Sequence, residues 1–192
     1  IEMGWPPPGE NAAKVAGYVS QLEDSLVAAA TEALNNLKPA RLAWGQGVAP
    51  FVMNRREWTD RGVILGANPR GPVDRSVPVL RIDDSAGKLI GVVFGTASHG
   101  VTMPGTHDRI NGDFPGYAQT ELERGHPGAQ AMFLAGCGAD ANPYPKGSIE
   151  ITRAHGKALA EEDARVLNGK LSPVQGPLRT ELRQVDLPLR SF

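Results

Sequence analysis

Two apolar runs, at 89–96 and 129–136, place the strongest constraint on the fold of this chain. Each has the length of a buried strand, and each ends in a polar loop that contains glycine. The segment between them has room for a helix, with Pro115 near its first turn. A strand, a helix and a second strand supply the crossover that parallel neighbours need. We therefore expect the two runs to lie side by side and parallel.

The other patterns predict a mixture of helices and strands. Apolar residues recur on one face from Asn11 to about Leu37, which predicts a helix that Lys38-Pro39 ends. The runs at 77–83 and 88–97 flank the turn sequence "DSAG" and predict a hairpin. The remaining expected elements are a strand at 41–47, a long loop at 45–76, helices at about 113–124 and 148–167, and a strand at 178–190.

These elements predict an α/β fold with a mixed, largely parallel sheet flanked by helices. We expect residues 1–192 to form a single domain segment. The chain has 20 basic and 21 acidic residues and no basic run longer than Arg55-Arg56, which argues against nucleic acid or an anionic membrane surface as a partner. No apolar stretch approaches the roughly 20 residues that span a bilayer.

The loops after the two parallel strands contain the candidate site residues. Because such loops meet at one edge of a sheet, His99, His107, Asp113, Asp140 and Asn142 are expected within reach of one site. His99 could bind a metal through a neutral imidazole nitrogen, or it could be a hydrogen-bonded structural histidine. His107 could equally be an exposed loop residue, and Asp140 could be a turn residue that accepts backbone N–H groups.

The sequence "GCGAD" at 136–140 contains two further candidates. Gly138 fits a sharp turn whose N–H groups could face an oxyanion. Cys137 is the single cysteine, and no Cys/His signature surrounds it, so we expect a small buried thiol. The motifs HExxH and His-x-His and paired CxxC are absent, and so is Gly-x-Ser-x-Gly, which disfavours an ordinary serine hydrolase.

Several stretches resemble the neutral/alkaline non-lysosomal ceramidases, and most closely a bacterial ceramidase-like branch of that family. They are "VDRSVPVLRIDDSAGKLIGVVFGTASHGVTM", "HDRINGDFPGYA" and "FLAGCGADANPYP", preceded in the same order by "LNNLKPARLAW" and "MNRR". The resemblance covers nearly the whole chain up to about Leu167. It implies an internal segment of the incomplete catalytic domain of a zinc-dependent amidase, which hydrolyses the N-acyl bond of ceramide.

The resemblance also implies roles for individual residues. His99 matches a zinc-binding histidine at the end of the same strand, and the remaining ligands are expected outside this chain. The serine nucleophile of the family is matched by Asn142 in "ADANP", in which Asp140 and Pro143 are kept. Asparagine cannot act as a serine-like nucleophile. Either a zinc-activated water attacks while Asn142 holds the carbonyl or its oxyanion, or the chain is not a ceramidase.

The expected function is therefore a Zn²⁺-dependent amide hydrolase similar to neutral ceramidase. The alternatives are a non-catalytic binding or structural domain that lost its nucleophile, and a zinc hydrolase of another amide or ester. The resemblance implies a lipid or other N-acyl substrate and a secreted, periplasmic or cell-surface location. The expected site residues are Asn142 and Asp140 in catalysis, His107, Asp113 and Gly138 in substrate binding, and His99 as the metal ligand.

Overall fold

The structure, a computed structural model, describes residues 11–177 and 179–186. It divides into two compact units, Ile1–Pro39 and Ala40–Phe192. The described part of the first unit contains the helix α1 (Asn11–Asn35), which ends close to the predicted stop at Lys38-Pro39. No helix in the described part of the chain is long and apolar enough to cross a membrane.

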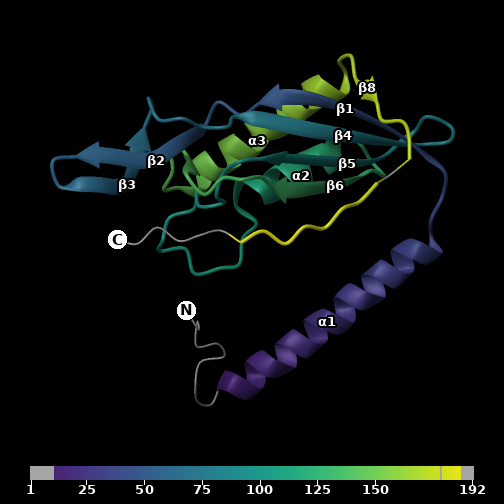
Figure 1. The fold of residues 1–192 in the computed structure, drawn as a ribbon, viewed down its shortest axis with the longest axis horizontal. Helices are drawn as coiled ribbons and strands as arrows, with labels where there is room; N and C mark the ends of the chain where they lie inside the picture. The colour runs from purple at the N-terminus through teal and green to yellow at the C-terminus, as the bar shows by residue number, and fades with distance from the viewer. Residues whose placement is uncertain (1–10, 178, 187–192) are drawn as a thin grey trace. The chain divides into compact units, whose positions relative to one another are not determined.

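The second unit is built on a five-stranded sheet with the order β6-β5-β4-β1-β8 (Figure 1). The parallel neighbours predicted from the two apolar runs are confirmed as β5 and β6, and the predicted hairpin is confirmed as β4 and β5. The mixed α/β class is also confirmed. The strands of this sheet are β1 (Ala40–Val48), β4 (Ser76–Asp84), β5 (Leu89–Thr96), β6 (Gln130–Ala135) and β8 (Ser172–Pro173).

The sheet is not largely parallel, and that part of the prediction is wrong. Among the described strands of this sheet, the β5–β6 pair is parallel and the other pairs are antiparallel. The reason lies in the connections, because the short turn between β4 and β5 can only reverse the chain. A helical crossover, which parallel pairing requires, joins β5 to β6.

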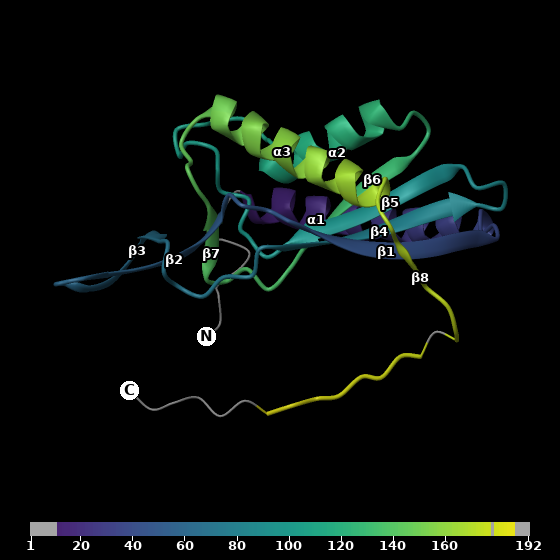
Figure 2. The ribbon, with the colours of Figure 1, turned by 90° about the horizontal axis from the view of Figure 1, so that it is seen from above.

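Two helices, α2 (Asp113–Gly125) and α3 (Ile149–Leu167), cover one face of this sheet (Figure 2). Both were predicted to within about two residues. The Ser148 hydroxyl caps the first turn of α3 by accepting a hydrogen bond from a main-chain N–H. The core lies between these helices and the sheet, and its fully buried side chains include Phe94, Phe114 and Leu159.

The predicted long loop at 45–76 is wrong, because most of it is strand. β1 continues to Val48, and β2 (Val52–Thr59) forms a hairpin with β3 (Gly62–Asn68). A third short strand, β7 (Ala141–Pro143), pairs with β2, so a second sheet has the order β3-β2-β7. The high Gly, Pro and Arg content hides the hairpin, since several of its residues are exposed and do not alternate between polar and apolar.

The strand predicted at 178–190 does not form at 179–186, and the remaining residues of that prediction lie outside the described part of the chain. β8 pairs instead with β1, at Ala43 and Trp44. The alternating pattern of residues 179–186, which predicted a strand, is therefore not accompanied by pairing with another strand.

Candidate functional site

The loops after β5 and β6 lie at one edge of the sheet and are joined by main-chain hydrogen bonds. The Gly136 N–H donates to the Thr96 carbonyl at 3.1 Å, and the His99 N–H donates to the Ala141 carbonyl at 3.2 Å. Because β5 and β6 are parallel, their carboxyl ends and the following loops meet. The predicted adjacency of the two loops is confirmed.

Gly138 allows these loops to approach closely. A side chain here would place its Cβ 2.5 Å from the Ala97 carbonyl carbon and 2.5 Å from the Ser98 nitrogen. The Gly138 N–H donates to the Gly136 carbonyl at 2.8 Å, so it is already used within the loop. The structure thus places Gly138 as the point of contact between two backbones, and its N–H is not available to a substrate oxyanion.

We expect Gly138→Ala to lower the free energy of unfolding by about 1–3 kcal/mol, because the new Cβ meets main-chain atoms that cannot rotate away. Denaturant titration would show a lower unfolding midpoint. Gly105→Ala is the matched control in the loop after β5, since its added Cβ would meet nothing within 4 Å. Equal midpoints for the two variants would contradict the tight contact at Gly138.

The His99 ring is held in one tautomer by the main chain. Its Nδ1 lies 3.0 Å from the Ala141 carbonyl oxygen. A carbonyl oxygen can only accept, so Nδ1 carries a proton, and in the neutral imidazole Nε2 then keeps its lone pair. Metal-binding histidines are oriented in this way by carbonyl groups behind them. His99 is half-buried and lines a cleft of about 480 Å³.

The cleft fits one metal ligand but not a complete metal site. It is lined by residues 98–100 from one loop and 136–139 from the other. Besides His99, the side chain there that could bind zinc is Cys137, which is exposed and not buried as predicted. Within the described residues, no three His, Cys, Asp or Glu side chains are grouped to hold a metal ion, whereas catalytic zinc usually has about three protein ligands.

Asn142 lies in β7, opposite Met53 of β2. Its side chain lines a second cavity of about 260 Å³ and not the His99 cleft. The two cavities are linked through the main chain, because the preceding residue, Ala141, provides the carbonyl that orients His99. Asn142 Oδ1 is buried and has no partner among the described residues, so a donor on a ligand would relieve its desolvation cost.

Asp113 is buried and holds together the loop before α2. Its carboxylate accepts the Met103 N–H at 2.9 Å and the Phe114 N–H at 2.7 Å. Its φ is +50°, in the left-handed region that aspartate tolerates better than most residues. Asp113 is the first residue of α2, after the N-cap Gly112. Both carboxylate oxygens of Asp113 therefore hold the backbone of this loop in place.

The structure places the other two predicted residues outside the lining of both cavities. The Nε2 atom of His107 is buried and has no partner among the described residues. The Asp140 carbonyl accepts the Arg55 N–H at 2.7 Å, which ties the loop after β6 to β2. The contact at Asp140 that positions the loop is thus made by its main chain.

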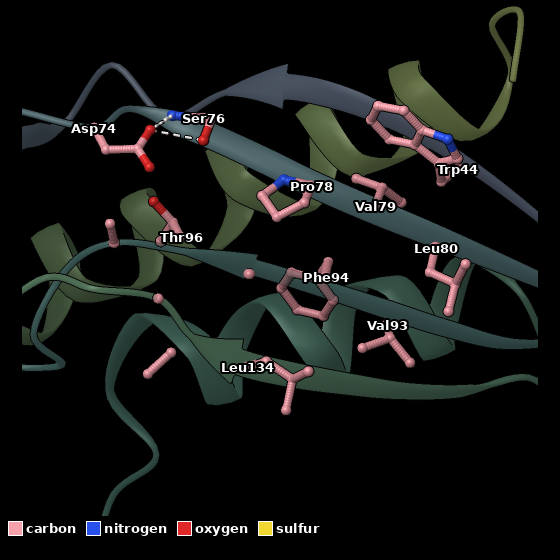
Figure 3. Close-up of a pocket in the computed structure, with 14 residues that line it drawn as sticks. Trp44, Asp74, Ser76, Pro78, Val79, Leu80, Val93, Phe94, Thr96 and Leu134 are labelled. Carbon is pink, nitrogen blue, oxygen red and sulfur yellow. Dashed lines mark hydrogen bonds between the residues drawn. The ribbon is translucent and has the colours of Figure 1, made fainter. Parts of the chain in front are cut away.

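A groove of about 370 Å³ lies on the sheet face opposite α2 and α3 (Figure 3). Alternation along the strands points Val79 and Phe94 into the core and their neighbours to this face. Two residues, Ala135 and Gly136, line both this groove and the His99 cleft, so the groove leads to His99. Its apolar walls include Trp44, Leu80, Val93 and Leu134, which come from four adjacent strands.

One end of the groove is polar. The Asp74 carboxylate accepts hydrogen bonds from the Ser76 N–H at 2.8 Å and the Ser76 hydroxyl at 2.6 Å, and these bonds lower the pKa of Asp74 (Figure 3). The Thr96 hydroxyl oxygen is buried and has no partner among the described residues. The sequence reasoning missed this groove because its residues come from strands far apart in the chain. The Ala141 carbonyl was missed because a main-chain group leaves no residue-specific signal.

Comparison with known proteins finds matches among solved structures. No family model and no curated protein matches this chain. The neutral ceramidase from Pseudomonas aeruginosa is 21% identical, with a TM-score of 0.65 over 80% of this chain and 26% of that chain. A ceramidase complexed with C2 is also 21% identical, with a TM-score of 0.62 over 76% of this chain and 25% of that chain.

This chain therefore spans about a quarter of the length of the ceramidases it matches. The resemblance predicted from the sequence motifs is confirmed at the level of the fold, which is that of a ceramidase-like α/β segment.

Proposed function

We propose that this chain is part of a zinc-dependent amide hydrolase that cleaves the N-acyl bond of ceramide or a related lipid amide. The observation that carries the proposal is the His99 ring, whose Nδ1 is engaged by the Ala141 carbonyl at 3.0 Å and whose Nε2 is free to bind a metal. The ceramidase-like fold supports the substrate class. A secreted, periplasmic or cell-surface location belongs to the same proposal.

Zinc, when bound, supplies a Lewis acid for the amide carbonyl and lowers the pKa of a coordinated water. In this proposal His99 holds it through Nε2, and the other ligands come from outside the described residues. The Ala141 carbonyl fixes the ring orientation, and Gly138 lets the two loops close behind it. Asn142 and Asp140 remain the proposed catalytic residues of this segment, with Asn142 acting from its neighbouring cavity.

The groove on the open sheet face suits an acyl chain. Its walls are largely apolar, and they continue through Ala135 and Gly136 into the His99 cleft. Burial of methylene groups there is favourable by about 0.8 kcal/mol each, which would hold a long chain in place. Asp74 and Thr96 at the polar end would meet the hydroxyl or amide groups of the lipid. His107 and Asp113 would then shape the surrounding loop without contacting this groove.

Asn142→Ala should lower turnover by about 10- to 1000-fold without abolishing it, because a hydrogen-bonding group for the reacting carbonyl is lost while the nucleophile is not. Single-turnover kinetics of the intact protein with an N-acyl substrate would measure the effect. Asn168→Ala, at the exposed end of α3, is the control and should leave turnover unchanged. Intact-mass analysis should find no acyl adduct, and a trapped adduct would contradict this role.

One alternative has specific support. Asn142 stands where the resembling family has its nucleophile, and its side chain lines a different cavity from His99. Both points favour a non-catalytic binding or structural domain. Zinc-loaded, folded protein that hydrolyses no amide or ester would establish this alternative. Hydrolysis of another amide or ester, but not of a lipid amide, would assign the site to a different substrate.

A further inference from the structure

The strand β2 connects a projecting hairpin to the strand that orients His99. On one side β2 pairs with β3, in a hairpin that extends away from the five-stranded sheet in both views (Figures 1 and 2), and on the other side it pairs with β7. The register places Asn54 opposite Ala141, the residue whose carbonyl oxygen contacts the His99 ring. One residue, Ala141, thus lies between Asn54 and the proposed metal ligand.

The Asn54 side chain is buried and uses both ends of its amide. Only 4% of the residue is exposed. Nδ2 donates to the Pro72 carbonyl at 2.7 Å, and Oδ1 accepts the Arg56 N–H at 2.8 Å. Gly71 leaves room for these contacts, because a Cβ there would lie 2.6 Å from Asn54 Cγ. An ionised aspartate at this position would lack the donor, and an alanine would lack both groups.

The bond from Arg56 to the Asn54 side chain lies at an irregular point of β2. The pairing of β2 with β3 shifts register between Asn54 and Arg56, and the Asn54 amide bridges the shift. The residue between them, Arg55, donates its N–H towards the other neighbour, to the Asp140 carbonyl at 2.7 Å. The Asn54 amide therefore holds in place the segment of β2 that contacts residues 140 and 141.

Ala141 links β2 to His99 through a single carbonyl oxygen. This oxygen accepts the His99 N–H at 3.2 Å and also lies 3.0 Å from Nδ1 of the ring. The Ala141 N–H donates to the Gly138 carbonyl at 3.1 Å. Because hydrogen bonds weaken steeply as their alignment is lost, a displacement of β7 would release the backbone and the ring of His99 together.

We propose that Asn54 is a positioning residue for His99, which acts through the β2 backbone and the Ala141 carbonyl to keep the ring in its Nδ1–H tautomer. The lone pair is then on Nε2, the proposed ligand atom. Groups behind a metal ligand fix its tautomer and orientation, and Asn54 supports such a group from one strand further away. The consequence for zinc rests on the proposed function, whereas the control of the tautomer does not.

The test is long-range ¹H–¹⁵N NMR of the intact, zinc-free protein at a pH at which imidazole is neutral. The ring nitrogen shifts report the tautomer, and the His99→Ala variant identifies the His99 signals. The original protein should show the Nδ1–H tautomer, and Asn54→Ala should show both tautomers. When zinc is added, Asn54→Ala should bind it about tenfold more weakly, at the lower end of the range for residues behind a ligand.

Asn68→Ala is the matched control. Asn68 lies opposite Asn54 on β3, where its amide donates to the Arg56 carbonyl at 2.9 Å and accepts the Arg70 N–H at 3.2 Å. It has the same two kinds of bond, but β3 does not pair with β7, so this variant should keep a single tautomer. Asn54→Asp keeps the acceptor for Arg56 and loses the donor to Pro72. It should show a smaller population of the second tautomer, and it keeps the test decisive if Asn54→Ala does not fold.

A single Nδ1–H tautomer in both Asn54 variants would overturn the proposal and leave Asn54 as an anchor of β2 alone. Mixed tautomers in Asn68→Ala would also overturn it, because they would reflect a general loosening of the hairpin. Failure of the proposed function would look different. If Asn54→Ala releases the His99 ring but the original protein neither binds zinc nor hydrolyses an amide, the positioning role stands and only the metal role is refuted.

Discussion

His99→Ala is expected to strip zinc from the intact protein and to reduce amide hydrolysis well beyond the roughly 10- to 100-fold loss typical of residues behind a metal ligand. The reason is that Nε2 is the proposed ligand atom and nothing else in the cleft can replace it with the same geometry. Cys137 shares the cleft, but it comes from the opposite loop. The expected result is a joint loss of metal and turnover with the fold retained.

Zinc stoichiometry and kcat/KM should be measured on the same preparation. His126→Ala is the control, because His126 follows α2 and does not line the His99 cleft. It should retain both zinc and activity. An unchanged zinc stoichiometry in the His99→Ala protein would show that His99 does not bind the metal. The 3.0 Å contact between His99 Nδ1 and the Ala141 carbonyl would then be purely structural.

Asp163 is expected to make the protein less stable as the pH rises from about 4 to about 8. It lies on α3, is fully buried, and neither carboxylate oxygen has a hydrogen-bond partner among the described residues. Burial raises its pKa from 3.8 to about 8, and the negative charge of Glu162 adds to the shift. The folded protein therefore keeps Asp163 protonated at neutral pH, while the unfolded chain releases the proton.

The sign of the effect follows from this difference. Below pH 4 both states hold the proton, and the contribution to stability is fully present. Between the unfolded and folded pKa values only the unfolded state ionises, so stability falls, and above pH 8 the loss levels off. A shift of this size corresponds to a loss on the order of 5 kcal/mol over the whole range.

Asp163→Asn has a similar shape but cannot ionise, so it should remove this pH dependence. The variant should match the original protein near pH 4 and exceed its stability by on the order of 5 kcal/mol near pH 8. Denaturant midpoints at several pH values would measure the difference. Asp60→Asn, at the exposed hairpin turn, is the control and should leave the pH profile unchanged. A stability difference that does not vary with pH would show that Asp163 titrates normally.

Much of the fold follows from local patterns. The two apolar runs and the segment between them predicted β5, α2 and β6 and their parallel pairing, and the helix expected at about 148–167 is α3. Periodicity and capping depend on residues a few positions apart, which the sequence displays directly. The same reasoning predicted that the loops after β5 and β6 lie close together, since the carboxyl ends of parallel neighbours lie at the same edge of a sheet.

Contacts between distant segments were decided only by the tertiary structure. The pairing of β7 with β2 determines which cavity Asn142 faces, and no pattern near Asn142 indicates that partner. The Ala141 carbonyl that selects the His99 tautomer is a main-chain atom, and every residue type has one. The pKa of Asp163 is raised because the packing of α3 buries its side chain. The identity of the residue does not reveal that burial.

The sequence by itself therefore determined the α/β class, the parallel β5–β6 unit and the place of His99 at the end of a buried strand. The tertiary structure decided the antiparallel pairing of β1 with β4 and β8, the separation of Asn142 from the His99 cleft, and the projection of the β2–β3 hairpin. The physical reason is the range of the interactions. Periodic burial is local along the chain, whereas the direction of a side chain at a sheet edge depends on which distant strand pairs with it.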